Sequence, residues 1–246
     1  MPAVLGVQVC SCRETNVRYL FTVLTHGDHG DVLAETVESF YANVTPAPHR
    51  RLVVQDGPAA LPPIVDPGVP WACFTTAGGP VGFCKATATM WAAAAACKTV
   101  DYVFWLEHDF RFDRPVDLTD LALILDDVDG APLAQVSLMR GSVNEVERVL
   151  GGVVADHRER GSVFAEHVTS RADRDVEWLE HGAYFTTNPC LMRRDFMEQN
   201  PWLVDPPREC EGRFGLELVQ RGYRFAVAGD GTPWVTHLGV RDGSGY

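Results

Sequence analysis

A run of apolar residues that ends in two acids is the part of the sequence best suited to chemistry. Residues 102–106 are all apolar, and Glu107, His108 and Asp109 follow with no turn residue between. Five apolar residues in a row predict a strand buried on both faces, as in a parallel sheet covered by helices. Ligands of open α/β sheets bind outside the carboxyl ends of such strands. Two carboxylates at that place predict a site for a hard divalent cation, although two solvated acids leading a loop would give the same pattern.

Composition and charge narrow the class of protein. The chain has 246 residues, of which 46% are hydrophobic and 22% charged, as in an ordinary globular protein. Its net charge of −12 and the absence of a long basic run disfavour nucleic acid and anionic membranes as partners. No apolar run approaches the length of a membrane span, and the first residues have no basic n-region, so we expect a cytoplasmic protein.

The cysteines support the same location. The seven cysteines are scattered, odd in number and without a C-x-x-C pair. This pattern predicts reduced thiols and neither a disulfide framework nor a zinc site. Cys84, Cys97 and Cys190 stand in apolar surroundings, so we expect them to fill the core.

Strands and helices alternate in the first half of the chain, which predicts how the acidic strand end is held. The patterns predict strands at 19–24, 51–56, 71–74 and 102–106, and helices at 32–43 and 85–97. Such alternation is typical of an α/β protein with a mostly parallel central sheet flanked by helices.

The second half is less regular. It predicts helices at 118–128, near 193–199 and at 211–221, and strands at 134–139, 183–187 and 223–227, and it leaves 141–181 unassigned. We expect one domain, 1–246, with a regular half at about 18–117 and a less regular half at about 118–246.

Polar residues follow other predicted strands as well. Asp56 ends the second strand, where it could satisfy local backbone amides as a turn former or accept hydrogen bonds from a nucleobase or ribose. Lys85, near the start of the alanine-rich helix, could be a surface charge or could neutralise a diphosphate beside the helix N-terminus.

Other enzyme classes find little support. His26, Asp28 and His29 partly match an H-x-H-x-D-H zinc motif, but Leu24 occupies the place of its first histidine. The sequence also lacks G-x-x-x-x-G-K-[ST], G-x-G-x-x-G after a strand, G-x-S-x-G and H-E-x-x-H. These absences disfavour Walker ATPases, classical dehydrogenases, α/β-hydrolases and zincins.

The order of the short motifs from about 19 to 239 resembles that of the inverting family 2 glycosyltransferases, which have the Rossmann-like GT-A fold. The stretches that carry the resemblance are Gln55-Asp56-Gly57, Gly82 to Ala86, Glu107-His108-Asp109, Tyr184 to Arg194, Glu209-Cys210-Glu211 with Arg221-Gly222-Tyr223, and Val235 to Gly239. The chain departs from the family pattern at Glu107, where an aspartate is usual, and at Cys210, which replaces a glutamate.

The resemblance implies a metal-dependent transfer of a sugar from a nucleotide-diphosphate sugar to an acceptor hydroxyl, with inversion. It also implies that the half at about 18–117 binds the nucleotide sugar and that the half at about 118–246 binds the acceptor and carries the catalytic base. Glu211 would be the general base, with Glu209 as the alternative, while Asp109 and His237 would hold Mn²⁺ or Mg²⁺. For Glu211 the simpler interpretation is an acid placed favourably in the first turn of a helix. The residues expected to contact the donor are Thr25, His26, Asp56, Lys85, Glu107, Asn188 and Arg241. A UDP-sugar is the first donor expected, and the acceptor could be a glycan, a lipid carrier, a protein or a small molecule.

Two other functions remain open. A nucleotidyltransferase of related fold would need a glycine-rich loop with Arg or Lys after the first strand, and residues 25–31 contain neither. A non-catalytic nucleotide- or carbohydrate-binding module would keep the fold without the chemistry. The presence of Asp109, Glu211 and His237 argues against such a module.

Overall fold

The structure is a computed structural model that describes residues 17–27, 30–57, 71–76, 79–127, 130–171, 173–203 and 210–239. Several predictions fall outside this part of the chain, namely those on Asp28, His29, Glu209 and Arg241. Among the described residues, no helix combines the length and the apolarity needed to cross a membrane.

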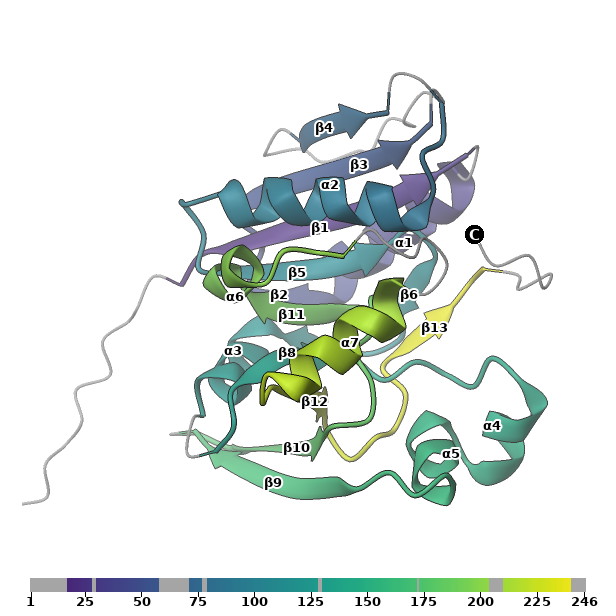
Figure 1. Cartoon of the computed structure of the whole chain (residues 1–246), viewed down its shortest axis with the longest axis vertical. Coiled ribbons are helices and arrows are strands. Elements are labelled where there is room, and N and C mark those ends of the chain that lie inside the picture. The colour runs from purple at the N-terminus through teal and green to yellow at the C-terminus, as the bar shows by residue number, and fades with distance from the viewer. Residues whose placement is uncertain are drawn as a thin grey trace, which may run out of the picture.

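A nine-stranded sheet runs through the described part of the chain, in the order β4-β3-β1-β5-β11-β8-β12-β10-β9 (Figure 1). The strands are β1 (Tyr19–His26), β3 (Arg50–Asp56), β4 (Trp71–Thr75), β5 (Tyr102–Glu107), β8 (Leu133–Ser137), β9 (Phe164–Ser170), β10 (Asp175–His181), β11 (Cys190–Arg193) and β12 (Arg224–Ala228). β4, β3, β1 and β5 are parallel, and the antiparallel β11 joins them to β8, which pairs in parallel with β12. The predicted α/β class with a large, mostly parallel sheet is confirmed.

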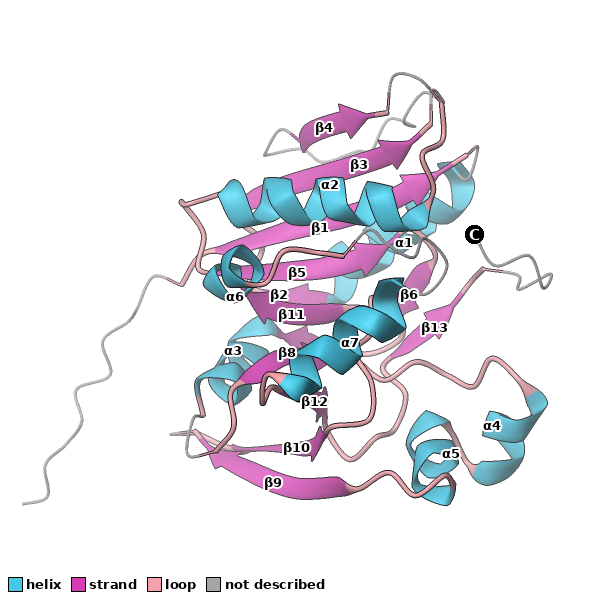
Figure 2. Cartoon of the chain, in the orientation of Figure 1, coloured by secondary structure: helices cyan, strands magenta, loops and turns pink. Residues whose placement is uncertain are grey.

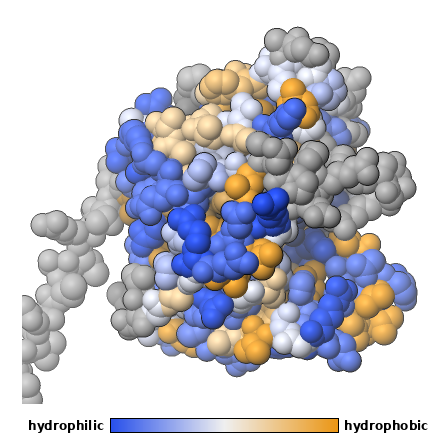
Figure 3. All heavy atoms as spheres, viewed as in Figure 1, coloured by the Kyte–Doolittle hydropathy of each residue, from blue (hydrophilic) through white to orange (hydrophobic). Residues whose placement is uncertain are grey.

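Helices cover both faces of this sheet, as the alternating pattern predicts (Figure 2). α1 (Gly30–Asn43) and α3 (Leu118–Asp126) pack into the core on one face, where Leu33, Val37 and Phe40 recur at helical spacing. α2 (Phe83–Ala96), α6 (Arg194–Gln199) and α7 (Cys210–Gln220) pack on the other face, around Trp91. In Figure 3 the outer surface over α7 is mainly hydrophilic.

The central strand β5 is buried as predicted. Val103, Phe104, Trp105 and Leu106 are 0% exposed, because β1 and β11 flank the strand and helices cover it. The strand continues through Glu107, so this acid stands at the end of the strand itself.

Short two-stranded ladders complete the fold. β6 (Phe110–Phe112) pairs with β13 (Val235–His237), and β2 (Val44–Thr45) pairs with β7 (Val116–Asp117). The unassigned stretch 141–181 forms two short helices, α4 (Glu145–Leu150) and α5 (Val153–Glu159), followed by the antiparallel β9–β10 pair.

The strand predicted at 183–187 is wrong, because this segment bonds to side chains instead of to a neighbouring strand. In the amide orientation that satisfies both groups, the buried Gln135 donates to the Thr186 carbonyl at 3.1 Å and accepts from the Thr186 N–H at 3.3 Å. The Thr187 N–H donates to the carboxylate of Glu211 at 2.6 Å. Sheet pairing resumes only at Cys190.

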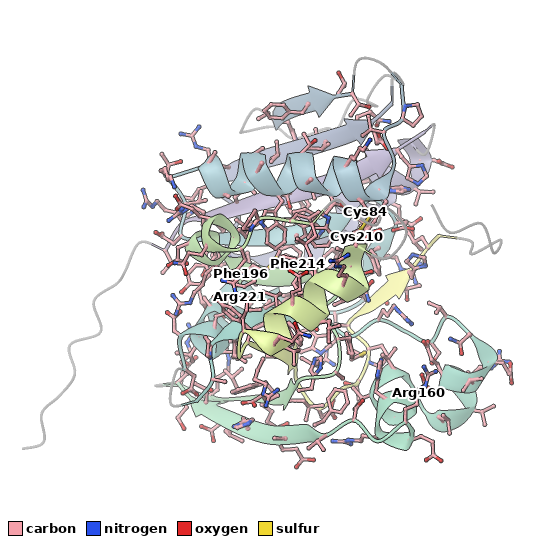
Figure 4. The ribbon with its side chains drawn as sticks, viewed as in Figure 1. Cys84, Arg160, Phe196, Cys210, Phe214 and Arg221 are labelled. Carbon is pink, nitrogen blue, oxygen red and sulfur yellow. A yellow bond between two sulfur atoms is a disulfide. The ribbon has the colours of Figure 1, made fainter. Side chains whose placement is uncertain are left out.

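The prediction of reduced thiols is wrong for one pair of cysteines. Cys84 and Cys210 form a disulfide across 126 residues, and both are 2% exposed (Figure 4). Cys190 is fully buried in the core, as expected. Disulfides are rare in reducing compartments, so this bond removes the support that the cysteines lent to a cytoplasmic location.

A buried histidine gives the fold a testable dependence on pH. His181 is 2% exposed and lies against the rings of Phe164 and Tyr184, with centroids at 4.8 Å and 4.5 Å. Burial, with a smaller contribution from His157, lowers the pKa of His181 to about 3. Between pH 6.5 and about 3 the unfolded chain therefore binds a proton that the folded chain does not, and stability is lost as the pH falls.

We expect urea unfolding to show that lowering the pH from 7.5 to 5.0 costs the wild-type chain about 2 kcal/mol through this histidine. His181→Phe should lack that part of the loss, because it has no group to protonate. An equal pH dependence in the two proteins would contradict this assignment.

Candidate functional site

The carboxyl ends of three parallel strands bring several predicted site residues to one edge of the sheet. The register pairs His26 of β1 with Asp56 of β3, and Leu24 of β1 with Glu107 of β5. The ring of His26 meets that of His108 edge-on, with centroids 4.9 Å apart. This is the edge at which open α/β sheets bind ligands.

Asp109 and His237 come together at the same edge despite their distance in sequence. The β6–β13 ladder pairs Phe110 with His237, and the backbone N–H of Leu238 donates to the Asp109 carbonyl at 2.6 Å. The two side chains then meet, with His237 Nε2 and Asp109 Oδ2 3.0 Å apart. They are 16% and 14% exposed, so water reaches both groups only in part.

The surroundings of Asp109 keep its carboxylate charged. Burial opposes ionisation, but the hydrogen bond with His237 and the charges of His108 and His237 outweigh it, and the pKa of Asp109 lies below its usual value. The second oxygen, Oδ1, is buried and has no hydrogen-bond partner in the described part of the chain. A buried carboxylate oxygen without a partner is costly, and a cation would compensate for it.

The pair fits a divalent metal ion. Carboxylate oxygen and imidazole nitrogen are both common ligands of divalent metals, and two adjacent ligands of an octahedral ion, each at about 2.1 Å, are about 3.0 Å apart. In the described residues no third His, Cys, Asp or Glu joins Asp109 and His237. The remaining positions would therefore fall to water and to oxygens of a bound ligand, as is usual for Mg²⁺.

A Cβ atom at Gly239 would lie 2.8 Å from Cε1 of His237 and would overlap Oδ2 of Asp109. Any side chain here would therefore push the two groups from their positions.

Asp56 is almost fully buried, and backbone amides of the segment before α2 surround its carboxylate. Its exposed fraction is 1%, and it accepts hydrogen bonds from the N–H groups of Val81, at 2.8 Å, and Gly82, at 2.9 Å. These contacts match the simpler interpretation of Asp56 as a residue that shapes a turn. Contact with a nucleobase stays a prediction.

The remaining donor-side candidates lie near this edge with different exposures. Thr25 is buried at 2%, whereas Lys85 is exposed in the first turn of α2. Asn188 is half-buried in the turn before β11, where its N–H donates to the Thr186 hydroxyl at 3.1 Å. Arg241 lies outside the described residues.

Glu211 is held in place by the segment before β11. Its Oε1 accepts from the N–H of Thr187 at 2.6 Å and from the Thr187 hydroxyl at 3.1 Å. One helical turn later, α7 packs directly on the backbone of Phe185, since a Cβ at Gly215 would lie 3.0 Å from the Phe185 nitrogen and 2.8 Å from its Cβ. The contacts of Glu211 with Thr187 and of Gly215 with Phe185 together fix how α7 packs on the segment before β11.

Glu211 and Glu107 are neighbours of the same buried thiol. Burial raises the pKa of Cys190, and the charges of Glu211 and Glu107 raise it further. Cys190 pairs with Trp105 of β5, two residues before Glu107. The structure thus brings the candidate base from the second half close to the strand-end acid from the first.

Several residues that shape the site carry no signal in the sequence. Thr187 and Gly215 matter through contacts with residues distant in the chain, and no local pattern marks them. The same holds for the disulfide partners. Gly239 belongs to a recognised motif, but its tight packing against Asp109 is visible only in three dimensions.

Comparisons with known proteins show the fold. No protein-family model and no curated protein sequence matches this chain. Among solved structures it is similar to the mannosyltransferase PcManGT from Pyrobaculum calidifontis, in complex with GDP-Man and Mn²⁺. The TM-score is 0.58 at 12% sequence identity, over 93% of this chain. The chain spans 59% of the length of that protein. The likeness establishes an α/β fold of the kind found in a nucleotide-sugar glycosyltransferase.

The close approach of α7 to Phe185 can be tested with two glycines of the same helix. Gly215→Ala should lower the free energy of unfolding by about 1–3 kcal/mol, because the new methyl group collides with the Phe185 backbone. Gly212→Ala is the matched control, since nothing lies within 4 Å of a Cβ there and alanine favours a helix. Equal unfolding midpoints for the two variants in urea would show that α7 does not pack as described.

Proposed function

We propose that this chain is a metal-dependent glycosyltransferase of the inverting GT-A type, which moves a sugar from a nucleotide-diphosphate sugar to an acceptor hydroxyl. The observation that carries the proposal is the half-buried Asp109–His237 pair at the carboxyl edge of the sheet, with the buried, unpartnered Oδ1 of Asp109. Glu211, close to the same edge, supplies a second carboxylate for acid–base chemistry.

The donor is proposed from the site and from the structural neighbour together. The neighbouring mannosyltransferase was solved with GDP-Man and Mn²⁺. For this chain we propose a nucleotide-diphosphate sugar with Mn²⁺ or Mg²⁺, and UDP-sugars and GDP-mannose are the donors to test first. Glu107, Thr25, His26, Asp56 and Asn188 are proposed to line the nucleotide and sugar positions, and Arg241 is proposed to assist at the diphosphate.

The departing diphosphate needs positive charge as its bond to the sugar breaks. A bound metal ion would stabilise that charge as a Lewis acid, and Asp109 and His237 are the residues that would hold it. Lys85 stands in the first turn of α2, where its ammonium group and the helix N-terminus both favour an anion.

The acceptor hydroxyl must lose its proton as it attacks the anomeric carbon. Glu211 is proposed to take that proton. The two hydrogen bonds from Thr187 hold one oxygen of Glu211, which limits the rotamers open to the side chain. A base on the face of the sugar opposite the leaving group gives a single displacement and therefore inversion.

Metal binding can be measured without a donor. We expect Asp109→Asn to weaken Mn²⁺ binding in isothermal titration by at least tenfold, because the anionic ligand is lost. Gly239→Ala should do the same without changing either ligand, since its methyl group displaces both. Asp113→Asn is the control, because this exposed acid directly follows β6 in the same ladder and pairs with Arg111. Unchanged Mn²⁺ affinity in Asp109→Asn would overturn the metal site.

The base assignment predicts a separation of binding from turnover. Glu211→Gln keeps an oxygen that can accept from Thr187, so donor affinity should stay within about twofold. Its kcat should fall by about 10²–10⁴, since the amide cannot accept the proton. Transfer to a panel of acceptors, or slow donor hydrolysis, gives the rate, and wild-type turnover in this variant would exclude Glu211 as the base. Donor cleavage with retention of a nucleotidyl group on the acceptor would instead identify a nucleotidyltransferase.

A further inference from the structure

The Cys84–Cys210 disulfide joins the beginnings of two helices on the same face of the sheet. Cys84 is the second residue of α2 and Cys210 is the first residue of α7, and their Cα atoms are 6.0 Å apart. Figure 4 shows the bond bridging the facing ends of these helices. Each cysteine is followed by a residue with a role in the proposed function, Lys85 after Cys84 and Glu211 after Cys210.

The rest of α7 is anchored further along the helix. Phe214 meets Trp91 of α2 edge-on, with centroids 5.2 Å apart, and Leu218 is buried in the same core. Gly215 rests on the backbone of Phe185. All three contacts lie one to two turns beyond Cys210, so they hold the body of the helix and not its first turn.

Two attachments of the first turn of α7 are seen among the described residues. One is the disulfide, and the other is the pair of hydrogen bonds between Thr187 and the Glu211 carboxylate. Helix ends fray where their first amide groups lack fixed partners. Loss of the covalent attachment would therefore loosen Glu211 while Phe214 and Leu218 keep α7 docked.

We propose that Cys84 and Cys210 are positioning residues, whose disulfide fixes Glu211 for proton transfer and makes sugar transfer dependent on the thiol redox state. An external dithiol reduces the Cys84–Cys210 bond by giving it two electrons and two protons. The two cysteines become thiols, and the reductant becomes a disulfide. The rate effect rests on the proposed function, whereas the ordering of the first turn of α7 does not.

The bond itself is tested by alkylation and mass spectrometry of the full chain. Denatured without reductant, the protein should leave Cys84 and Cys210 unmodified by iodoacetamide, and a dithiol reductant should make both reactive. Alkylation of both residues before reduction would overturn the proposal.

The positioning role is tested with the double variant Cys84→Ala and Cys210→Ala, and independently with the reduced wild-type chain in case the variant does not fold. Each should show a kcat lowered about 10- to 100-fold with the donor KM changed by less than threefold. Cys97→Ser, at the other end of α2, is the control and should match the wild type.

Hydrogen exchange provides a readout that needs no activity. Reduction should speed exchange at the Thr187 amide and in the first turn of α7, and should leave the amides around Phe214 protected. Unchanged exchange at Thr187 after complete reduction would overturn the positioning role. If the oxidised chain cleaves no nucleotide sugar but exchange responds as described, the proposed function fails while the role of the disulfide stands.

Discussion

A half-buried carboxylate just beyond the end of the central strand is the constraint on which the site depends. Asp109 is 14% exposed and carries a charge, so the fold must surround it with compensating groups. One such group comes from a segment distant in sequence: β13 pairs with β6 and places His237 against the carboxylate. This pairing also explains why residue 239 is a glycine, since a side chain there would occupy the space in which Asp109 and His237 meet.

Much of the fold could be predicted from the sequence because the signals are local. The apolar run 102–106 and the helical spacing of apolar residues in 32–43 report burial directly, and the structure confirms the strand and the helix. The segment 183–187 has the composition of a strand, but its hydrogen bonds go to Gln135 and Glu211, which no local pattern encodes. The meeting of Asp109 with His237 was expected only from the order of the motifs, since their spacing alone does not reveal it.

A chain of contacts connects the strand-end acids to the candidate base. Asp56 was open to two interpretations in the sequence, and its hydrogen bonds to Val81 and Gly82 make it an anchor for the start of α2. Two residues after Gly82 comes Cys84, which is bonded to Cys210, the residue before Glu211. The position of Glu211 is thereby tied to the end of β3, although the two residues belong to different halves of the chain.

The direction of one strand explains how the second half reaches the site. In an all-parallel sheet, the segment that leads into the strand beside β5 would arrive at the opposite edge, far from Glu107 and Asp109. β11 instead runs antiparallel to β5 and pairs Cys190 with Trp105, so the segment before β11 lies at the carboxyl end of β5. That segment contains Thr187, which holds Glu211. The reversal of β11 is thus the topological reason that a carboxylate from α7 can work beside residues at the ends of β5 and β13.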